Sequence, residues 1–234
     1  MRLLVSVTDS GEARVAVDGG VDIVDVKNPA EGSLGAPAPG VIERVRDVVP
    51  PERPVSAAIG DLPNLLGTAA LAAVGAARSG AAYVKVGLWG TSTTDQAVAV
   101  LRAVRDAVDG AATVIAAAYA DADRVPSGPL LPGAVVEAAR RAGIGGCLLD
   151  TAVKDGRGLF EWLSPEAIET LVAAGHAAGL EMALAGALRA EDLSLVRATG
   201  ADIAGVRAAA CRDGSRTAPL DAERIGRLRA ECEG

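Results

Sequence analysis

The stretch Val21–Gly35, VDIVDVKNPAEGSLG, predicts a buried strand that ends in a loop of small residues. Branched apolar residues favour a strand over Asp22–Lys27, and the Asn-Pro pair that follows breaks it. Because side chains alternate between the two faces of a strand, Asp25 and Lys27 are expected on one face. A carboxylate and an amine thus lie at the C-terminal end of this strand, where they could form a buried ion pair that orients the amine.

The alternation of short strands with helices continues along the whole chain. Eight strands are expected, at Leu3–Ser6, Asp22–Lys27, Pro54–Ile59, Tyr83–Gly87, Thr113–Tyr119, Gly146–Asp150, Glu181–Ala185 and Asp202–Val206. Eight helices are expected between and after them, at Gly11–Gly19, Gly40–Val48, Thr68–Ser79, Thr94–Val108, Pro132–Ala142, Ser164–Ala178, Glu191–Thr199 and Asp221–Glu231.

This order predicts an α/β fold in which residues 1–234 form one domain, a single (β/α)8 TIM barrel. A doubly wound open sheet is the alternative. It usually has fewer strands and often a glycine-rich first turn, and neither GxGxxG nor GxxxxGK[ST] occurs here.

Composition narrows the class of protein. Hydrophobic residues make up 50% of the chain and charged residues 23%, enough apolar material for a sizeable core. The net charge of −7 argues against a nucleic-acid binder. Three cysteines without CxxC spacing suggest reduced thiols, and the longest apolar run, Ala69–Ala77, is too short to span a bilayer. We therefore expect a cytoplasmic protein without a membrane or nucleic-acid partner.

The three lysines carry the strongest functional signal. The chain has 23 basic residues, of which only Lys27, Lys85 and Lys154 are lysine. The predicted barrel places all three near the C-terminal ends of strands, where barrel enzymes have their active sites, with Asp25 and Asp150 beside them. One lysine there could equally be solvated or ion-paired. Three together favour a Schiff-base site, because neighbouring amines lower one another's pKa and a neutral amine attacks carbonyl groups.

A phosphate site is expected at the same rim. In many such barrels the loops after the seventh and eighth strands bind phosphate through backbone N–H groups. Ordinary turn glycines and a rim arginine are the alternative reading of these loops. The candidates are Gly186, Gly205, Arg207 and Ala208, with Ser33 and Gly35 for a second phosphate and Arg212 and Arg216 as weaker choices.

The remaining polar and aromatic residues give weaker signals. The only histidine, His176, is expected on a helix surface, which leaves no Ser-His-Asp triad and no zinc site. Asp121 and Asp123 follow the fifth strand and could hold water, a substrate hydroxyl or a metal, or cap the next segment. Trp89 could cover the site, although packing is the simpler role. The cysteines are expected to fill the core or loops.

Seven motifs together resemble one enzyme family. They are DVKNPAEGSLGA, VSAAIGD, AAVGAARSGAAYVKVGLWG, AAAYADADR, LLDTAVKDG, ALAGAL and DIAGVRAAAC. The chain resembles the (5-formylfuran-3-yl)methyl phosphate synthases, also called 4-(hydroxymethyl)-2-furancarboxaldehyde-phosphate synthases, the barrel enzymes of methanofuran biosynthesis. The resemblance runs from the first strand to the last helix.

The resemblance implies a reaction and a set of roles. Two molecules of glyceraldehyde 3-phosphate would condense into a phosphorylated furan aldehyde with loss of phosphate and water. Lys27 would form the Schiff base and Lys85 would transfer protons, supported by Asp25, Asp150 and Lys154. No metal or other cofactor is expected, since the iminium itself withdraws electrons. A homo-oligomer is expected, because Ala-rich helices permit close packing between subunits.

Two other functions stay open at this point. A class I lysine aldolase acting on another phosphorylated aldehyde would use the same lysines, so only the product would separate it. A non-catalytic barrel that binds phosphorylated metabolites would keep the fold, and its ligand binding would survive Lys27→Ala.

Overall fold

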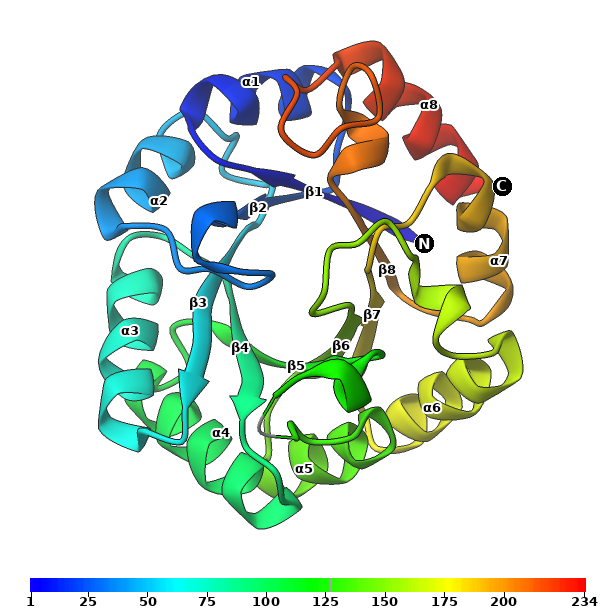
Figure 1. Ribbon diagram of the computed structural model, residues 1–234. Coiled ribbons are helices and arrows are strands. Elements are labelled where there is room, and N and C mark those ends of the chain that lie inside the picture. Colours follow the sequence, from blue (N-terminus) through cyan, green and yellow to red (C-terminus); the bar gives the residue numbers. More distant parts are fainter. Residues whose placement is uncertain (127) are drawn as a thin grey trace.

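The computed structural model describes residues 1–126 and 128–234 as a closed barrel of parallel strands in which each strand pairs with the next (Figure 1). The strands are β1 (Arg2–Val7), β2 (Ile23–Val26), β3 (Val55–Pro63), β4 (Tyr83–Gly90), β5 (Thr113–Tyr119), β6 (Gly146–Asp150), β7 (Glu181–Leu184) and β8 (Ile203–Val206). β8 pairs with β1 and closes the barrel. The predicted TIM barrel is confirmed.

A ring of helices surrounds the strands. They are α1 (Ser10–Asp18), α2 (Pro39–Arg46), α3 (Leu66–Arg78), α4 (Thr94–Val108), α5 (Val135–Ala142), α6 (Pro165–Ala177), α7 (Leu193–Ala198) and α8 (Ala222–Glu233). Local sequence explains where several of them begin. Asp9 caps α1 by accepting two backbone N–H groups, and Ser164 caps α6 just before a proline at its first position.

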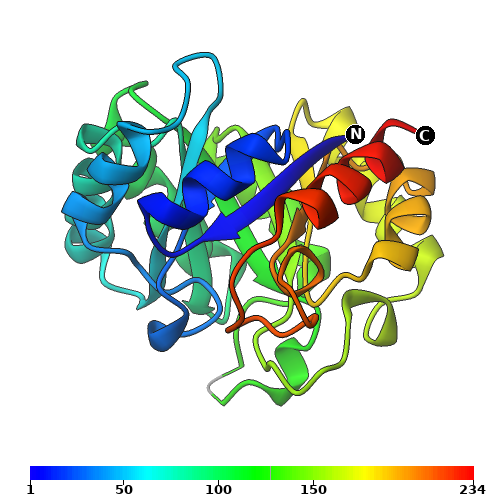
Figure 2. The same ribbon diagram turned by 90° about the horizontal axis from the view of Figure 1, so that it is seen from above.

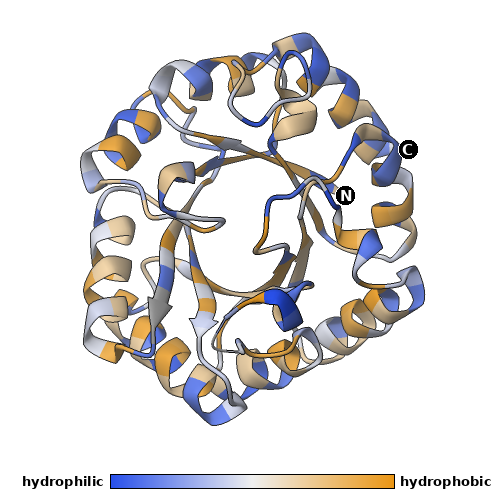
Figure 3. Cartoon of the chain, in the orientation of Figure 1, coloured by the Kyte–Doolittle hydropathy of each residue, from blue (hydrophilic) through white to orange (hydrophobic). Residues whose placement is uncertain are grey.

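The hydrophobic core has two parts, one on each side of the strands. The larger part lies between strands and helices, and the smaller part, which includes Ile23, Ile115 and Leu148, fills the barrel interior. Figure 3 shows the strands as mostly hydrophobic, with hydrophilic residues concentrated on the helices and loops. In β2, Val24 packs with the larger part and Ile23 with the smaller. By the same alternation Asp25 faces the barrel interior.

Several element boundaries differ from the prediction. β4 was expected to end at Gly87 but continues to Gly90, so Lys85 lies further inside its strand than predicted. β3 was expected to end at Ile59, but it continues through a bulge and pairs with β4 as far as Pro63. Gly60 permits this continuation because it adopts a positive φ of 100°. The segments before α5 and α7 begin as 3-10 turns, Pro132–Ala134 and Ala190–Asp192.

The long loops gather at the C-terminal ends of the strands. Figure 2 shows this rim at the bottom of the view, while both termini lie at the opposite end. There the amino group of Met1 donates to the carbonyl oxygen of Cys232 at 3.4 Å. Within the described part of the chain, no helix combines the length and apolar character that crossing a membrane requires.

Candidate active site

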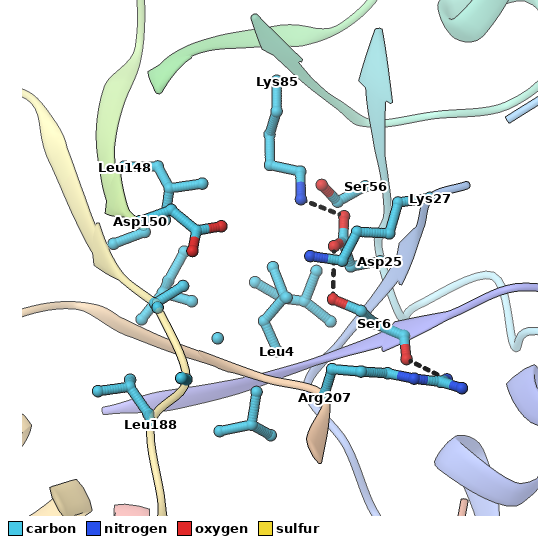
Figure 4. A pocket seen from close by; sticks show the side chains of 18 of the residues that line it. Leu4, Ser6, Asp25, Lys27, Ser56, Lys85, Leu148, Asp150, Leu188 and Arg207 are labelled. Atoms are coloured by element: carbon cyan, nitrogen blue, oxygen red, sulfur yellow. Dashed lines mark hydrogen bonds and ion pairs between the residues drawn. The ribbon is translucent and has the colours of Figure 1, made fainter. Parts of the chain in front are cut away.

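A pocket of about 260 Å³ extends from the barrel interior to the loops that follow β7 and β8. Figure 4 shows its polar side chains converging from several strands. Its lining includes all three lysines and the two carboxylates predicted beside them, namely Asp25, Lys27, Lys85, Asp150 and Lys154.

Asp25 and Lys85 form a buried ion pair on the pocket wall. The Lys85 amine lies 2.6 Å from Oδ1 of Asp25, and their side chains are 5% and 0% exposed. The Ser6 hydroxyl donates to the other Asp25 oxygen at 3.0 Å. The sequence suggested Lys27 as the partner of Asp25, and this was wrong. The long Lys85 side chain instead reaches across β3 to Asp25.

Lys27 is left without an ion pair among the described residues. Its amine faces the carbonyl oxygen of Ser33 at 3.5 Å. Burial lowers the pKa of Lys27 from 10.5 to about 8; Asp150 opposes this shift, whereas the charges of Lys85 and Lys154 add to it. The predicted effect of neighbouring lysines is therefore present, but burial is the larger cause. Lys27 is thus the amine best suited to be neutral near physiological pH.

Asp150 and Lys154 form a second pair at the end of β6. The Lys154 amine donates to Asp150 at 2.9 Å and to the Thr151 carbonyl at 2.7 Å. Burial alone would raise the pKa of Asp150, but the charges of Lys154 and Lys27 outweigh it and hold that pKa at about 2. Asp150 is therefore a permanent negative charge that faces both lysines.

Asp121 holds the backbone that carries Lys154. Its two carboxylate oxygens accept the N–H groups of Ala152 at 2.7 Å and of Val153 at 2.8 Å. The sequence left several roles open for Asp121, and the structure shows that it caps a segment. That segment is the loop after β6. Asp123 is exposed in the 3-10 turn Ala122–Arg124.

The four residues predicted at the first phosphate site all line the pocket: Gly186, Gly205, Arg207 and Ala208. Gly186 has a positive φ of 103°, and an added Cβ would come within 3.0 Å of the Thr151 nitrogen. Arg207, however, directs its guanidinium at Glu12, with contacts of 2.6 and 2.8 Å. Its charge is therefore largely neutralised before any phosphate binds.

Arg216 is the more available cation in these loops. It lines the pocket, and within residues 1–126 and 128–234 its guanidinium forms no ion pair. Its carbonyl oxygen accepts a hydrogen bond from Arg207 Nε at 3.0 Å, which ties the β8–α8 loop to the end of β8. Arg216, which the sequence ranks below Arg207 as a phosphate ligand, is thus the arginine whose guanidinium is not ion-paired among the described residues.

Ser33 and Gly35 close the β2–α2 loop. Neither is among the described residues that line the pocket. The Ser33 hydroxyl donates to the Thr151 carbonyl at 2.9 Å. A Cβ at Gly35 would collide with the Asn28 carbonyl, so only glycine fits this turn. The contacts of both residues fasten the loop beside Lys27, and a second phosphate site there stays a prediction.

Sequence reasoning missed two polar groups near the site. Ser56 lines the pocket with a buried hydroxyl, and only the period-2 alternation of β3 could have indicated it. Asp61 accepts a hydrogen bond from the Tyr119 hydroxyl, and burial raises its pKa to about 6. Trp89 packs edge-on against Tyr119 with ring centroids 5.9 Å apart, so it has the packing role.

Of the other weak candidates, only Cys147 is among the described residues that line the pocket. His176 is exposed on α6 with Nε2 2.9 Å from Asp202. The thiols of Cys147, Cys211 and Cys232 are buried and unbridged. Across residues 1–126 and 128–234, no three His, Cys, Asp or Glu side chains are grouped to hold a metal ion.

Solved structures with the same fold include several enzymes of phosphorylated sugars. A 3-hexulose-6-phosphate synthase from Salmonella typhimurium matches with a TM-score of 0.65 and 18% identity, covering 99% of this chain and 100% of that one. Phosphoribosyl anthranilate isomerase from Thermus thermophilus matches with a TM-score of 0.63 and 20% identity, covering 100% and 98%. At such low identity these likenesses show the fold alone.

Sequence relatives are far closer. A (5-formylfuran-3-yl)methyl phosphate synthase from Methanopyrus kandleri is 52% identical over 92% of this chain and 91% of its own. The protein of the same name from Methanocaldococcus jannaschii is 48% identical over the full length of both chains. The family model described as 4-HFC-P synthase matches residues 3–229. The family predicted from the motifs is confirmed, and the chain belongs to the 4-HFC-P synthase family.

Proposed function

We propose that this protein is a Schiff-base synthase that condenses two molecules of glyceraldehyde 3-phosphate into (5-formylfuran-3-yl)methyl phosphate. One observation carries the proposal: the Lys27 amine has a pKa of about 8 and no ion pair among the described residues, inside a pocket that holds two further lysines. The names of the close relatives supply the product.

The first steps of the proposed reaction use Lys27 and the Asp25–Lys85 pair. Neutral Lys27 attacks the aldehyde carbon, and loss of water leaves an iminium. The iminium draws electrons from the neighbouring carbon and acidifies its C–H bond. We assign this proton transfer to Lys85, and its ion pair with Asp25 at 2.6 Å supports the assignment, because the carboxylate stabilises the charge on the amine. The product of these steps is an enamine on Lys27.

The later steps join the two trioses. The enamine expels the phosphate on the third carbon by β-elimination, which leaves that carbon as the nucleophilic end of an enol. Proton transfer moves the carbonyl of the second triose from its first to its second carbon, and aldol-type attack of the enol at that second carbon forms the carbon–carbon bond of the branched skeleton. Cyclisation and dehydration complete the furan and release Lys27. Two molecules of glyceraldehyde 3-phosphate then give the phosphorylated furan aldehyde, one phosphate and two waters, counting all steps. Atoms and electrons balance without an added oxidant or reductant.

The charges at the rim suit the remaining phosphate groups. Gly186 and Gly205 permit close backbone approach in the loops after β7 and within β8. Arg216 adds a cation whose guanidinium has no ion pair in the described part of the chain. Lys154 is paired with Asp150, and we assign it to steering the second substrate or to proton transfer.

A class I lysine aldolase is the second candidate, because the same three lysines would serve it. Its substrate would be another phosphorylated aldehyde, so the identity of the product separates the two enzymes. A barrel that only binds phosphorylated metabolites is the third possibility. It predicts ligand binding that does not depend on a covalent bond to Lys27.

The test is mass spectrometry of the intact protein after incubation with glyceraldehyde 3-phosphate and borohydride, with the small products analysed in parallel. The chain has three lysines and the amino group of Met1, and peptide mapping tells an adduct on Lys27 from one on the other three amines. We expect a triose adduct on Lys27 and a phosphorylated furan aldehyde in solution. An adduct with a different product would favour the aldolase, and neither adduct nor product would favour the binding protein.

The matched variant is Lys27→Arg. It keeps a positive charge but cannot form an imine, so we expect no adduct and at least a thousandfold lower turnover, of the order that loss of a covalent nucleophile costs. Substantial turnover by this variant would sink the Schiff-base assignment.

A further inference from the structure

The Ser56 hydroxyl is a buried polar group that lacks a hydrogen-bond partner among the described residues. Ser56 is only 1% exposed, and it lines the pocket. A buried hydroxyl without a partner costs free energy, and most such groups in folded proteins are satisfied by protein or bound water. An unpaired hydroxyl on a pocket wall therefore indicates a partner that arrives with the ligand.

The strand register places Ser56 next to the residues assigned to proton transfer. Ser6 pairs with Asp25 across β1 and β2, and Asp25 pairs with Ser56 across β2 and β3. The three side chains form one row around the barrel interior, and Lys85 reaches Asp25 from β4. Figure 4 shows the Ser56 hydroxyl beside the Asp25 carboxylate and the Lys85 amine.

Ser6 and Ser56 flank Asp25 in the same row but differ in one respect. The Ser6 hydroxyl donates to Asp25 at 3.0 Å, whereas the Ser56 hydroxyl is unused. Lys27 follows Asp25 by two residues on the same strand face, so its amine lies nearer the rim than this row. A substrate joined to Lys27 would therefore have the row of Ser56 beneath it.

We propose that Ser56 binds the hydroxyl group on the carbon next to the aldehyde of the substrate, and so selects 2-hydroxyaldehydes. The inference rests on the proposed function. With the aldehyde carbon on Lys27 and the phosphate toward the loops after β7 and β8, the adjacent carbon faces the floor of the pocket. Ser56 then holds the hydroxyl of that carbon and leaves its C–H bond to Lys85, the group assigned to proton transfer.

The alternative partner is a water molecule that stays in the pocket during the reaction. A water would not distinguish a substrate with the hydroxyl from one without it. If Ser56 instead bonds the substrate hydroxyl, the protein would distinguish the two substrates, because a site built to bond such a group rejects the analogue that lacks it. The pair of aldehydes to compare is glyceraldehyde 3-phosphate and 3-phosphooxypropanal, which differ only in the 2-hydroxyl.

The experiment measures the initial rate of reductive trapping on Lys27 against aldehyde concentration, by the mass of the peptide that carries Lys27. Three proteins are compared: wild type, Ser56→Ala, and Ser56→Cys, whose thiol fills the space but donates only weakly. We expect both variants to need roughly tenfold more glyceraldehyde 3-phosphate for half-maximal trapping, the size of one hydrogen bond. For 3-phosphooxypropanal we expect all three proteins to behave alike.

Ser6→Ala serves as the matched control from the same row. Its hydroxyl already bonds Asp25, so its loss should change trapping of both aldehydes by the same factor. If Ser56→Ala also changed both aldehydes equally, or neither, the assignment of Ser56 to the substrate hydroxyl would be overturned. If the wild-type protein formed no adduct with either aldehyde, the proposed Schiff base on Lys27 would be contradicted. That outcome differs from one in which adducts form but Ser56→Ala does not discriminate between the aldehydes.

Discussion

The carboxylate of Asp25 lies 2.6 Å from the amine of Lys85, although Lys27 is the lysine nearest to it in the sequence. The other carboxylate predicted beside the lysines, Asp150, is paired with Lys154 at 2.9 Å. Asp25 and Asp150 are thus ion-paired with Lys85 and Lys154. Lys27 has no ion-pair partner within the described residues. This division gives the three lysines different environments, which is the condition for giving them different roles.

The pH dependence of trapping should report the Lys27 amine. Burial, with the charges of Lys85 and Lys154, lowers the pKa of Lys27 from 10.5 to about 8. At pH 7 its neutral fraction is then about 300-fold larger than for an ordinary lysine. The initial rate of borohydride trapping should rise about tenfold per pH unit below 8 and level off above it.

Two results would check this assignment. A rate that keeps rising to pH 10 would contradict it. Asp150 raises the pKa of Lys27, so in Asp150→Asn the levelling should move to lower pH. A variant profile identical to that of wild type would mean that the titration belongs to another group.

The barrel and the meeting of the lysines at its rim could be predicted because both follow from local patterns. Alternation within β2 places Asp25 and Lys27 on one face, and the order of strands and helices places the end of β6 at the same rim. The bounds of α4, β5 and β6 agree with the prediction residue for residue. Each of these statements needs only residues that are close in the sequence.

The pairings inside the site could not be predicted, because they depend on register between distant segments. Lys85 finds Asp25 only because β3 lies between their strands with a defined offset. Arg207 is captured by Glu12, 195 positions earlier in the chain. The composition of the two loops gives no sign of that contact, so Arg207 was ranked above Arg216 as a phosphate ligand.

Asp121 is predicted to stabilise the loop that carries Lys154. Asp121→Ala leaves the N–H groups of Ala152 and Val153 without their acceptors. At about 1–3 kcal/mol for each buried unsatisfied group, we expect a loss of up to about 6 kcal/mol in the free energy of unfolding, less for the partly buried N–H of Val153. Urea denaturation measures it. Asp123→Ala, at an exposed position two residues on, should stay within about 0.5 kcal/mol of wild type.

Arg216 is predicted to bind a substrate phosphate. Arg216→Ala should raise the KM for glyceraldehyde 3-phosphate at least tenfold, because a charge-assisted contact to phosphate is worth roughly 1.5–3 kcal/mol. Arg212→Ala is the control, since Arg212 is 67% exposed, lies in the same loop and is 4.0 Å from Asp221. Steady-state kinetics of both variants measures the KM. If Arg216→Ala and Arg212→Ala had the same KM, Arg216 would not be a ligand of the phosphate.

Asp61 is predicted to lower stability at neutral pH. Burial raises its pKa from 3.8 to about 6, so the folded protein binds this proton more tightly than the unfolded chain does. The stabilising contribution is complete below pH 4 and is lost as the pH rises through 6. A shift of about two pKa units corresponds to about 3 kcal/mol, which is an upper bound for a side chain that is only partly enclosed.

Asp61→Asn removes this titration while keeping a polar side chain that can bond Tyr119. The difference in unfolding free energy, variant minus wild type, should therefore grow by up to about 3 kcal/mol between pH 4 and pH 7. Urea denaturation at several pH values measures it. Asp123→Asn, at an exposed position, should give a difference within about 0.5 kcal/mol throughout. A difference for Asp61→Asn that shrinks as the pH rises would contradict the raised pKa, and would make the charged carboxylate a stabilising partner of Tyr119 instead.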